Sequence, residues 1–166
     1  MNLLRLAVVS CGFLGLSPVA PGTVGTLAGV LIVWGLARLE LFALWMLVVC
    51  ALLYVVGRSL GEWAESRARG KDPGFFVLDE VLGYLVTLLW VRGPSLFAMA
   101  FGFAVFRFFD IVKPPPVRRF ERIRGGDGIL LDDVVAGLYG LGVMSLARLA
   151  FGDASLWIHG GSAAGG

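Results

Sequence analysis

The stretch that organises this chain is FRFFDIVKPPPVRRFERIRGGDGILLDDVVAG, residues 106–137. It begins within an apolar segment that contains Arg107 and Asp110. Three prolines at 114–116 end that segment, because proline lacks the backbone N–H that a continuing helix needs. A basic run and a Gly-Gly pair follow, and a second apolar segment leaves with an Asp-Asp pair at 132–133. Apolar helices that carry acids near their adjoining ends, joined by a basic loop, indicate a metal ion and an anionic substrate.

The composition is that of an integral membrane protein. Of 166 residues, 58% are hydrophobic and 16% are charged, whereas an average soluble domain has roughly 45–50% apolar and 25% charged residues. The net charge of +2 is too small to predict a broad nucleic-acid-binding surface, and two cysteines are too few for a disulfide scaffold. We expect one domain over residues 1–159 and a flexible tail of Gly, Ser and Ala over 160–166.

The hydropathy pattern predicts an all-α fold, a compact membrane bundle of about four to five apolar helices with short or broken helices at the N-terminus. Pro18 and Pro21 interrupt the N-terminal part, and Thr26 is placed to cap a helix that begins near Leu27. The clearest candidate span is 41–57. The other apolar segments are 3–16, 27–37, 75–91, 95–112 and 129–151.

The polar loops fix a topology. The loops at 58–72 and 113–127 hold most of the cations, so the positive-inside rule places both in the cytoplasm. The acids inside the apolar segments then fall at one depth, near the inner membrane face. These acids are Asp79, Glu80, Asp110, Asp132 and Asp133.

A group of acids at that depth needs positive charge, since a charged side chain in a membrane helix costs roughly 2.5 kcal/mol or more at the centre and less near the end. Arg107 lies three residues before Asp110, on the same helix face, and Lys113 follows. These two cations leave an excess of carboxylates, and Mg²⁺ is the economical partner because it takes carboxylate ligands and phosphate oxygens together. Asp72 and Asp127 are better explained as helix caps or loop salt bridges.

Two further features suit a phosphorylated substrate. Arg118 belongs to the basic loop, and arginine binds phosphate bidentately. The glycine-rich loop from Ser17 to Thr26, which includes Thr23, offers backbone N–H groups and hydroxyls to phosphate oxygens. Gly83 and Gly137 each follow an acid by four residues and would let two helices approach closely.

Several phosphatase mechanisms are excluded by residue type. His159 is the single histidine and lies near the tail, so a histidine nucleophile is unavailable to the interior. Neither cysteine precedes a short arginine-bearing loop, and no D-x-D-x-T/V aspartyl-phosphate signature occurs. Metal-assisted attack by water, with a carboxylate as general base, remains.

The chain resembles the phosphatidylglycerophosphatase A family of bacterial inner-membrane lipid phosphatases over residues about 12 to 145. The blocks that carry the resemblance are GLSPVAPGTVGTLAG (15–29), LDEVLGYLVTL (78–88), FRFFDIVKPPPVRRFER (106–122) and GGDGILLDDVVAG (125–137). The resemblance implies Mg²⁺-dependent hydrolysis of phosphatidylglycerophosphate at the cytoplasmic face, with phospholipid and no nucleic acid as partner.

By the same resemblance, the five acids at one depth are the metal ligands, and Asp79, Glu80 and Asp133 among them are the catalytic residues. Arg107 and Lys113 are then phosphate partners. An alternative from the residues alone is a cation or proton transporter that uses the acids as a relay, which would need acids spread across the bilayer. A metal-dependent phosphatidyltransferase also uses carboxylates, but its D-G…A-R…G…D…D signature is not placed on this sequence.

Overall fold

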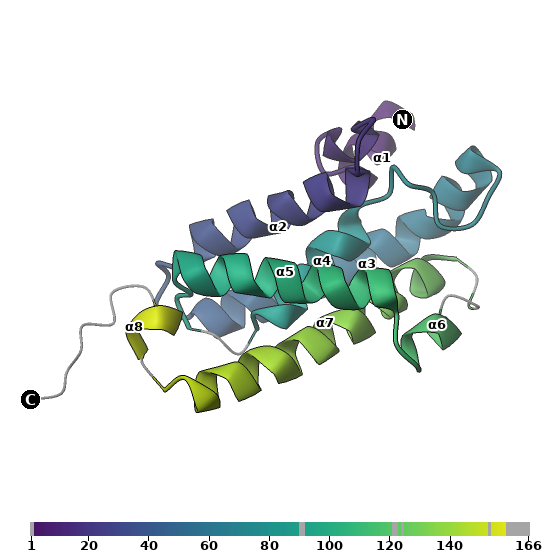
Figure 1. Ribbon diagram of the computed structural model, residues 1–166. Helices are drawn as coiled ribbons and strands as arrows, with labels where there is room; N and C mark the ends of the chain where they lie inside the picture. Colours follow the sequence, from purple (N-terminus) through teal and green to yellow (C-terminus); the bar gives the residue numbers. More distant parts are fainter. Residues whose placement is uncertain (1, 90–91, 121–122, 124, 153, 159–166) are drawn as a thin grey trace, which may run out of the picture.

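The computed structural model describes residues 2–89, 92–120, 123, 125–152 and 154–158, and within them it is all-helical, as the sequence predicts (Figure 1). Its elements are α1 (Asn2–Val9), the 3₁₀ helix η1 (Leu14–Leu16), α2 (Pro21–Leu36), α3 (Phe42–Ala68), α4 (Leu78–Thr87), α5 (Leu96–Val112), α6 (Val117–Phe120), α7 (Gly126–Ala150) and α8 (Ala154–Trp157). The predicted tail at 160–166 lies outside the described residues.

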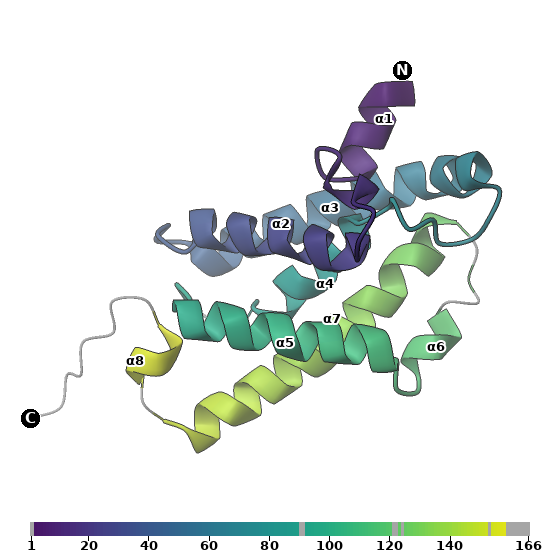
Figure 2. The same ribbon diagram turned by 45° about the horizontal axis from the view of Figure 1, so that its top comes forward.

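The bundle is built around α4, which lies between α2, α3, α5 and α7 (Figures 1 and 2). Every residue of α4 is buried except Glu80, which is half-buried. An apolar helix of 10 residues is about 15 Å long, too short to cross a bilayer. It is therefore the core of the fold, and its first turn holds a pair of acids inside the protein.

Glycines bring α4 and α7 into backbone contact. A Cβ on Gly137 would lie 2.4 Å from the Gly83 carbonyl oxygen, and a Cβ on Gly83 would lie 2.7 Å from the Asp133 carbonyl oxygen. No larger residue fits at either position without moving a helix. The prediction that these glycines permit close approach is confirmed.

Two helix boundaries differ from the sequence prediction. The second helix begins at Pro21 instead of near Leu27, because proline is well tolerated at the first helical position; Thr26 therefore lies inside the helix and does not cap it. Residues 58–68, expected as a polar loop, continue α3, since Gly61 and Ala64 are buried against the core while polar side chains face outward.

Two described helices, α3 and α7, are long and apolar enough to cross a membrane, so the prediction of four to five apolar membrane helices is not confirmed. Only 11% of the most apolar part of α3 is buried. Its exposed side chains include Leu44, Trp45, Leu47, Val48, Leu52 and Val55. The first predicted apolar segment, 3–16, is broken by positive φ angles at Cys11, Gly12 and Phe13.

Candidate active site

An acidic cluster occupies the interior where α4 meets α7. Asp79 and Glu80 come from the first turn of α4, and Asp133 from the second turn of α7; one carboxylate oxygen from each lies within 4.8 Å of the others. Asp79 is 6% exposed and Asp133 is 3% exposed. Asp110, near the end of α5, lies close enough to interact with the Asp133 carboxyl group. Acids from three helices thus meet in one place, as the sequence predicts, while their individual roles stay predictions.

The donors of this acidic cluster suit a divalent cation. The Glu80 Oε2 atom is buried and has no hydrogen-bond partner among the described residues. Burial raises the pKa of the Asp79 carboxyl well above 3.8, and the neighbouring Glu80 charge raises it further. Close, buried carboxylates repel one another, and a cation bound between them would remove both costs. An all-oxygen donor set fits Mg²⁺ and other hard divalent ions alike.

The two predicted phosphate cations border the acidic cluster, each held by an acid. Arg107 Nη1 donates to Asp110 Oδ2 at 2.5 Å, and Lys113 Nζ donates to Asp132 Oδ2 at 2.8 Å. Arg107 Nε is buried and makes no hydrogen bond within the part of the chain that the structure describes. Asp132 is buried but is not one of the three clustered acids. Asp132 and its neighbour Asp133 therefore have different surroundings: Asp132 contacts Lys113, and Asp133 faces Asp79 and Glu80.

The N-terminus of α2 closes the site from a third side. A Cβ on Gly22 would lie 2.3 Å from Glu80 Oε1 and 3.2 Å from Arg107 Nη1. The first backbone N–H groups of a helix lack intrahelical partners and carry partial positive charge, which favours carboxylates and phosphates beside them. Gly22 was not predicted individually from the sequence, where the available signal was a Pro-Gly pair at a helix start.

The other predicted substrate residues are less directly placed. Ser17 is half-buried in a turn, where its hydroxyl donates to the Val19 carbonyl at 2.9 Å, and Thr23 lies in the first turn of α2. The Thr26 hydroxyl is fully buried and donates to the Gly22 carbonyl at 2.8 Å. Arg118 is exposed on α6, with no described contact to the acids. Substrate contact by these residues stays a prediction.

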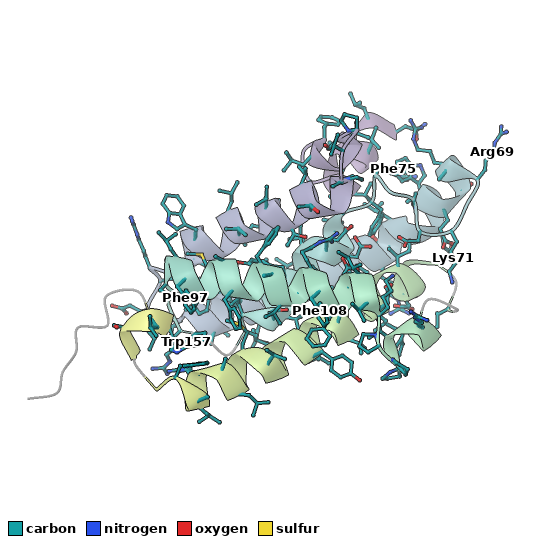
Figure 3. The ribbon with its side chains drawn as sticks, viewed as in Figure 1. Arg69, Lys71, Phe75, Phe97, Phe108 and Trp157 are labelled. Atoms are coloured by element: carbon teal, nitrogen blue, oxygen red, sulfur yellow. The ribbon has the colours of Figure 1, made fainter. Side chains whose placement is uncertain are left out.

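A cavity of about 230 Å³ lies beside Asp132. Its other lining residues are Lys71, Asp72, Gly128 and Ile129. Lys71 lies on the loop after α3, at the end of the bundle where α6 is found (Figure 3). From the sequence, Lys71 is only one of the loop cations that indicate topology, because the composition of a loop does not show which cation lines a cavity.

The fold and site together define an all-helical protein with a buried, carboxylate-rich centre at one end of its bundle. The chain belongs to the phosphatidylglycerophosphatase A family, whose family model matches residues 7–148, and it is a phosphatase.

Relatives in several bacteria support this membership. The chain is 37% identical to phosphatidylglycerophosphatase A of Escherichia coli, covering 78% of this chain and 75% of that protein. It is 37% identical to phosphatidylglycerophosphatase A of Haemophilus influenzae, over 84% and 85% respectively. A Bacteroides thetaiotaomicron protein named as a candidate phosphatidylinositol-3-phosphatase is 38% identical, over 83% and 89%. No solved structure matches the chain.

Proposed function

We propose that this protein removes the terminal phosphate of phosphatidylglycerophosphate, giving phosphatidylglycerol and inorganic phosphate, with Mg²⁺ as cofactor. The observation that carries the proposal is the convergence of Asp79, Glu80 and Asp133 within 4.8 Å in a chain of this family. The names of the relatives from E. coli and H. influenzae supply the substrate.

The acidic cluster would hold the cation, with Asp79, Glu80 and Asp133 as its nearest ligands and Asp110 beside them. Bound Mg²⁺ supplies Lewis-acid chemistry, because it offsets the charge of the phosphate that is attacked. A carboxylate of the pair Asp79 and Glu80 is the general base that takes a proton from water as the new P–O bond forms. The bond from phosphorus to the glycerol oxygen breaks, and that oxygen leaves as a hydroxyl once it has received the proton that the carboxylate took from water.

The cations at the border hold the phosphate. Arg107 and Lys113 are multiple donors, since a guanidinium has five N–H groups and an ammonium three, and both are held beside carboxylates at this end of the bundle. The N-terminus of α2 adds backbone N–H groups around Gly22. These groups orient the phosphate without taking part in proton transfer.

A location in the bacterial inner membrane, with the site facing the cytoplasm, completes the proposal. The exposed apolar surface of α3 supports it, as do four cations in the last turns of α3 and the loop that follows: Arg58, Arg67, Arg69 and Lys71. Substrate acyl chains would then stay in lipid while the headgroup enters the protein.

The test is phosphate release by purified protein in mixed micelles, with and without Mg²⁺. Phosphatidylglycerophosphate should be hydrolysed only with the cation. Phosphatidylinositol 3-phosphate is the competing substrate, because the B. thetaiotaomicron relative is named for it. A higher kcat/KM for that lipid would show that it, and not phosphatidylglycerophosphate, is the substrate. Equal rates in Mg²⁺ and in chelator would show that the reaction does not need the cation.

A further inference from the structure

A second and larger cavity, of about 910 Å³, lies at the other end of the bundle. It is lined by Ala43, Leu89, Arg92, Ser145, Arg148, Leu149, Gly152 and Trp157. Along α7, Arg148 is 15 residues beyond Asp133, which is about 22 Å of helix. We propose that this distal cavity binds the headgroup of an anionic phospholipid from the opposite leaflet, separately from the acidic cluster.

The wall formed by the C-terminal segment is firmly built. Trp157 is 2% exposed, its indole N–H donates to the Phe151 carbonyl at 3.1 Å, and its ring makes edge contacts with Phe97 and Phe101. The Ser95 N–H donates to the Trp157 carbonyl at 3.1 Å, which ties α8 to the start of α5. Figure 3 shows Trp157 close to Phe97 at this end of the bundle. The cavity therefore has a fixed shape on one side.

The charged residues among the described lining of the distal cavity are both arginines. Arg92 and Arg148 both line it, and neither forms an ion pair within the described part of the chain. Glu40, three residues before Ala43, does not line the cavity. Guanidinium groups bind phosphate bidentately, so the fitting ligand carries a phosphate group.

The surface around the mouth is apolar, which favours a lipid over a soluble phosphate. Leu41 is 61% exposed beside the start of α3, and Leu149 and Phe151 are 81% and 64% exposed at the end of α7. Acyl chains can lie against these side chains while the headgroup phosphate meets the arginines. The inference relies on the membrane placement proposed above, and it does not rely on which lipid is hydrolysed.

The experiment uses the full chain in zwitterionic detergent and measures bound lipid by native mass spectrometry. Phosphatidylserine is the probe, because it is anionic and has no phosphomonoester to hydrolyse; phosphatidylcholine with the same acyl chains is the reference. The double variant Arg92→Gln/Arg148→Gln removes both cavity cations. Arg38→Gln is the matched control: Arg38 is exposed, stacks on Trp34 and does not line the cavity.

Wild type and Arg38→Gln should retain phosphatidylserine in preference to phosphatidylcholine. The double variant should lose that preference, with binding weaker by about fivefold for each arginine removed. Equal retention in all the proteins would overturn the proposal. Displacement of phosphatidylserine by inorganic phosphate at equal concentration would also overturn it, because the cavity would then be a small-anion site.

Phosphatase activity separates this proposal from the proposed function. The double variant should release phosphate at the wild-type rate, since Arg148 lies about 22 Å along α7 from Asp133 and Arg92 lines the same distal cavity. Lipid preference in a protein without phosphatase activity would refute only the proposed function.

Discussion

The substitution Gly22→Ala tests the contact between α2 and the acidic cluster. An added Cβ would lie 2.3 Å from Glu80 Oε1, whereas ordinary van der Waals contact begins at 3.4 Å. The carboxylate must therefore move by about 1 Å, and a displacement of that size in a catalytic group costs about 100-fold in rate, or about 2.7 kcal/mol. We expect kcat/KM for phosphate release to fall by that factor.

The matched control is Gly35→Ala on the same helix, where an added Cβ meets nothing within 4 Å. Alanine is favoured over glycine in helices by up to about 1 kcal/mol, so neither variant should lose its fold for want of helix propensity. Thermal unfolding and circular dichroism check this. Gly35→Ala should keep wild-type kcat/KM. Wild-type kcat/KM in Gly22→Ala would refute the contact between α2 and Glu80 as a determinant of the site.

Three further predictions concern the buried acids and the close packing of α4 against α7. Asp79→Asn should lower phosphate release by at least about 100-fold with the fold retained, while Asp127→Asn, at a partly exposed acid outside the cluster, should stay near wild type; similar rates in both would refute the assignment. Gly83→Ala should destabilise the protein by about 1–3 kcal/mol through overpacking against Phe106 and α7, whereas Gly142→Ala meets nothing within 4 Å and should not; equal melting temperatures would contradict the close packing. Without a cation, the free energy of unfolding should fall as pH rises above 3.8. The pKa of the Asp79 carboxyl is raised in the folded protein, which therefore keeps this proton after the unfolded chain has released it. Bound Mg²⁺ should flatten this pH dependence, and an identical pH profile with and without Mg²⁺ would argue against binding there.

The acids of the site could be predicted from sequence because an apolar segment rarely tolerates a carboxylate without a reason. Asp79 and Asp133 stand in such segments, each with a glycine four residues later, and both the cluster and the glycine contact are present in the structure. Their positions in the segments, together with the topology given by the cationic loops, were enough to place them at one depth.

The different contacts of the neighbouring acids Asp132 and Asp133 could not be predicted. Successive residues of a helix point about 100° apart, so Asp132 and Asp133 face different surroundings, and the sequence does not say which one faces α4. The structure turns Asp133 into the acidic cluster and Asp132 toward Lys113.

The start of α2 was missed for a related reason. A Pro-Gly-Thr run is typical of a loop, but proline at the first position and glycine at the second also begin a helix when the turn packs against another element. Here Gly25 packs on Val77, the residue before α4. That contact holds the start of α2 against Glu80. Tertiary packing of this kind cannot be seen in a single sequence.

The central claim is that the buried acids from α4 and α7 hold one functional divalent-cation site. Titration of the purified protein with Mn²⁺, followed by electron paramagnetic resonance, measures this directly, with Mn²⁺ standing in for Mg²⁺. Wild type and Asp127→Asn should show saturable binding that Mg²⁺ displaces, and Asp79→Asn and Asp133→Asn should each lose it. Undiminished, Mg²⁺-displaceable binding in both of those variants would contradict the claim.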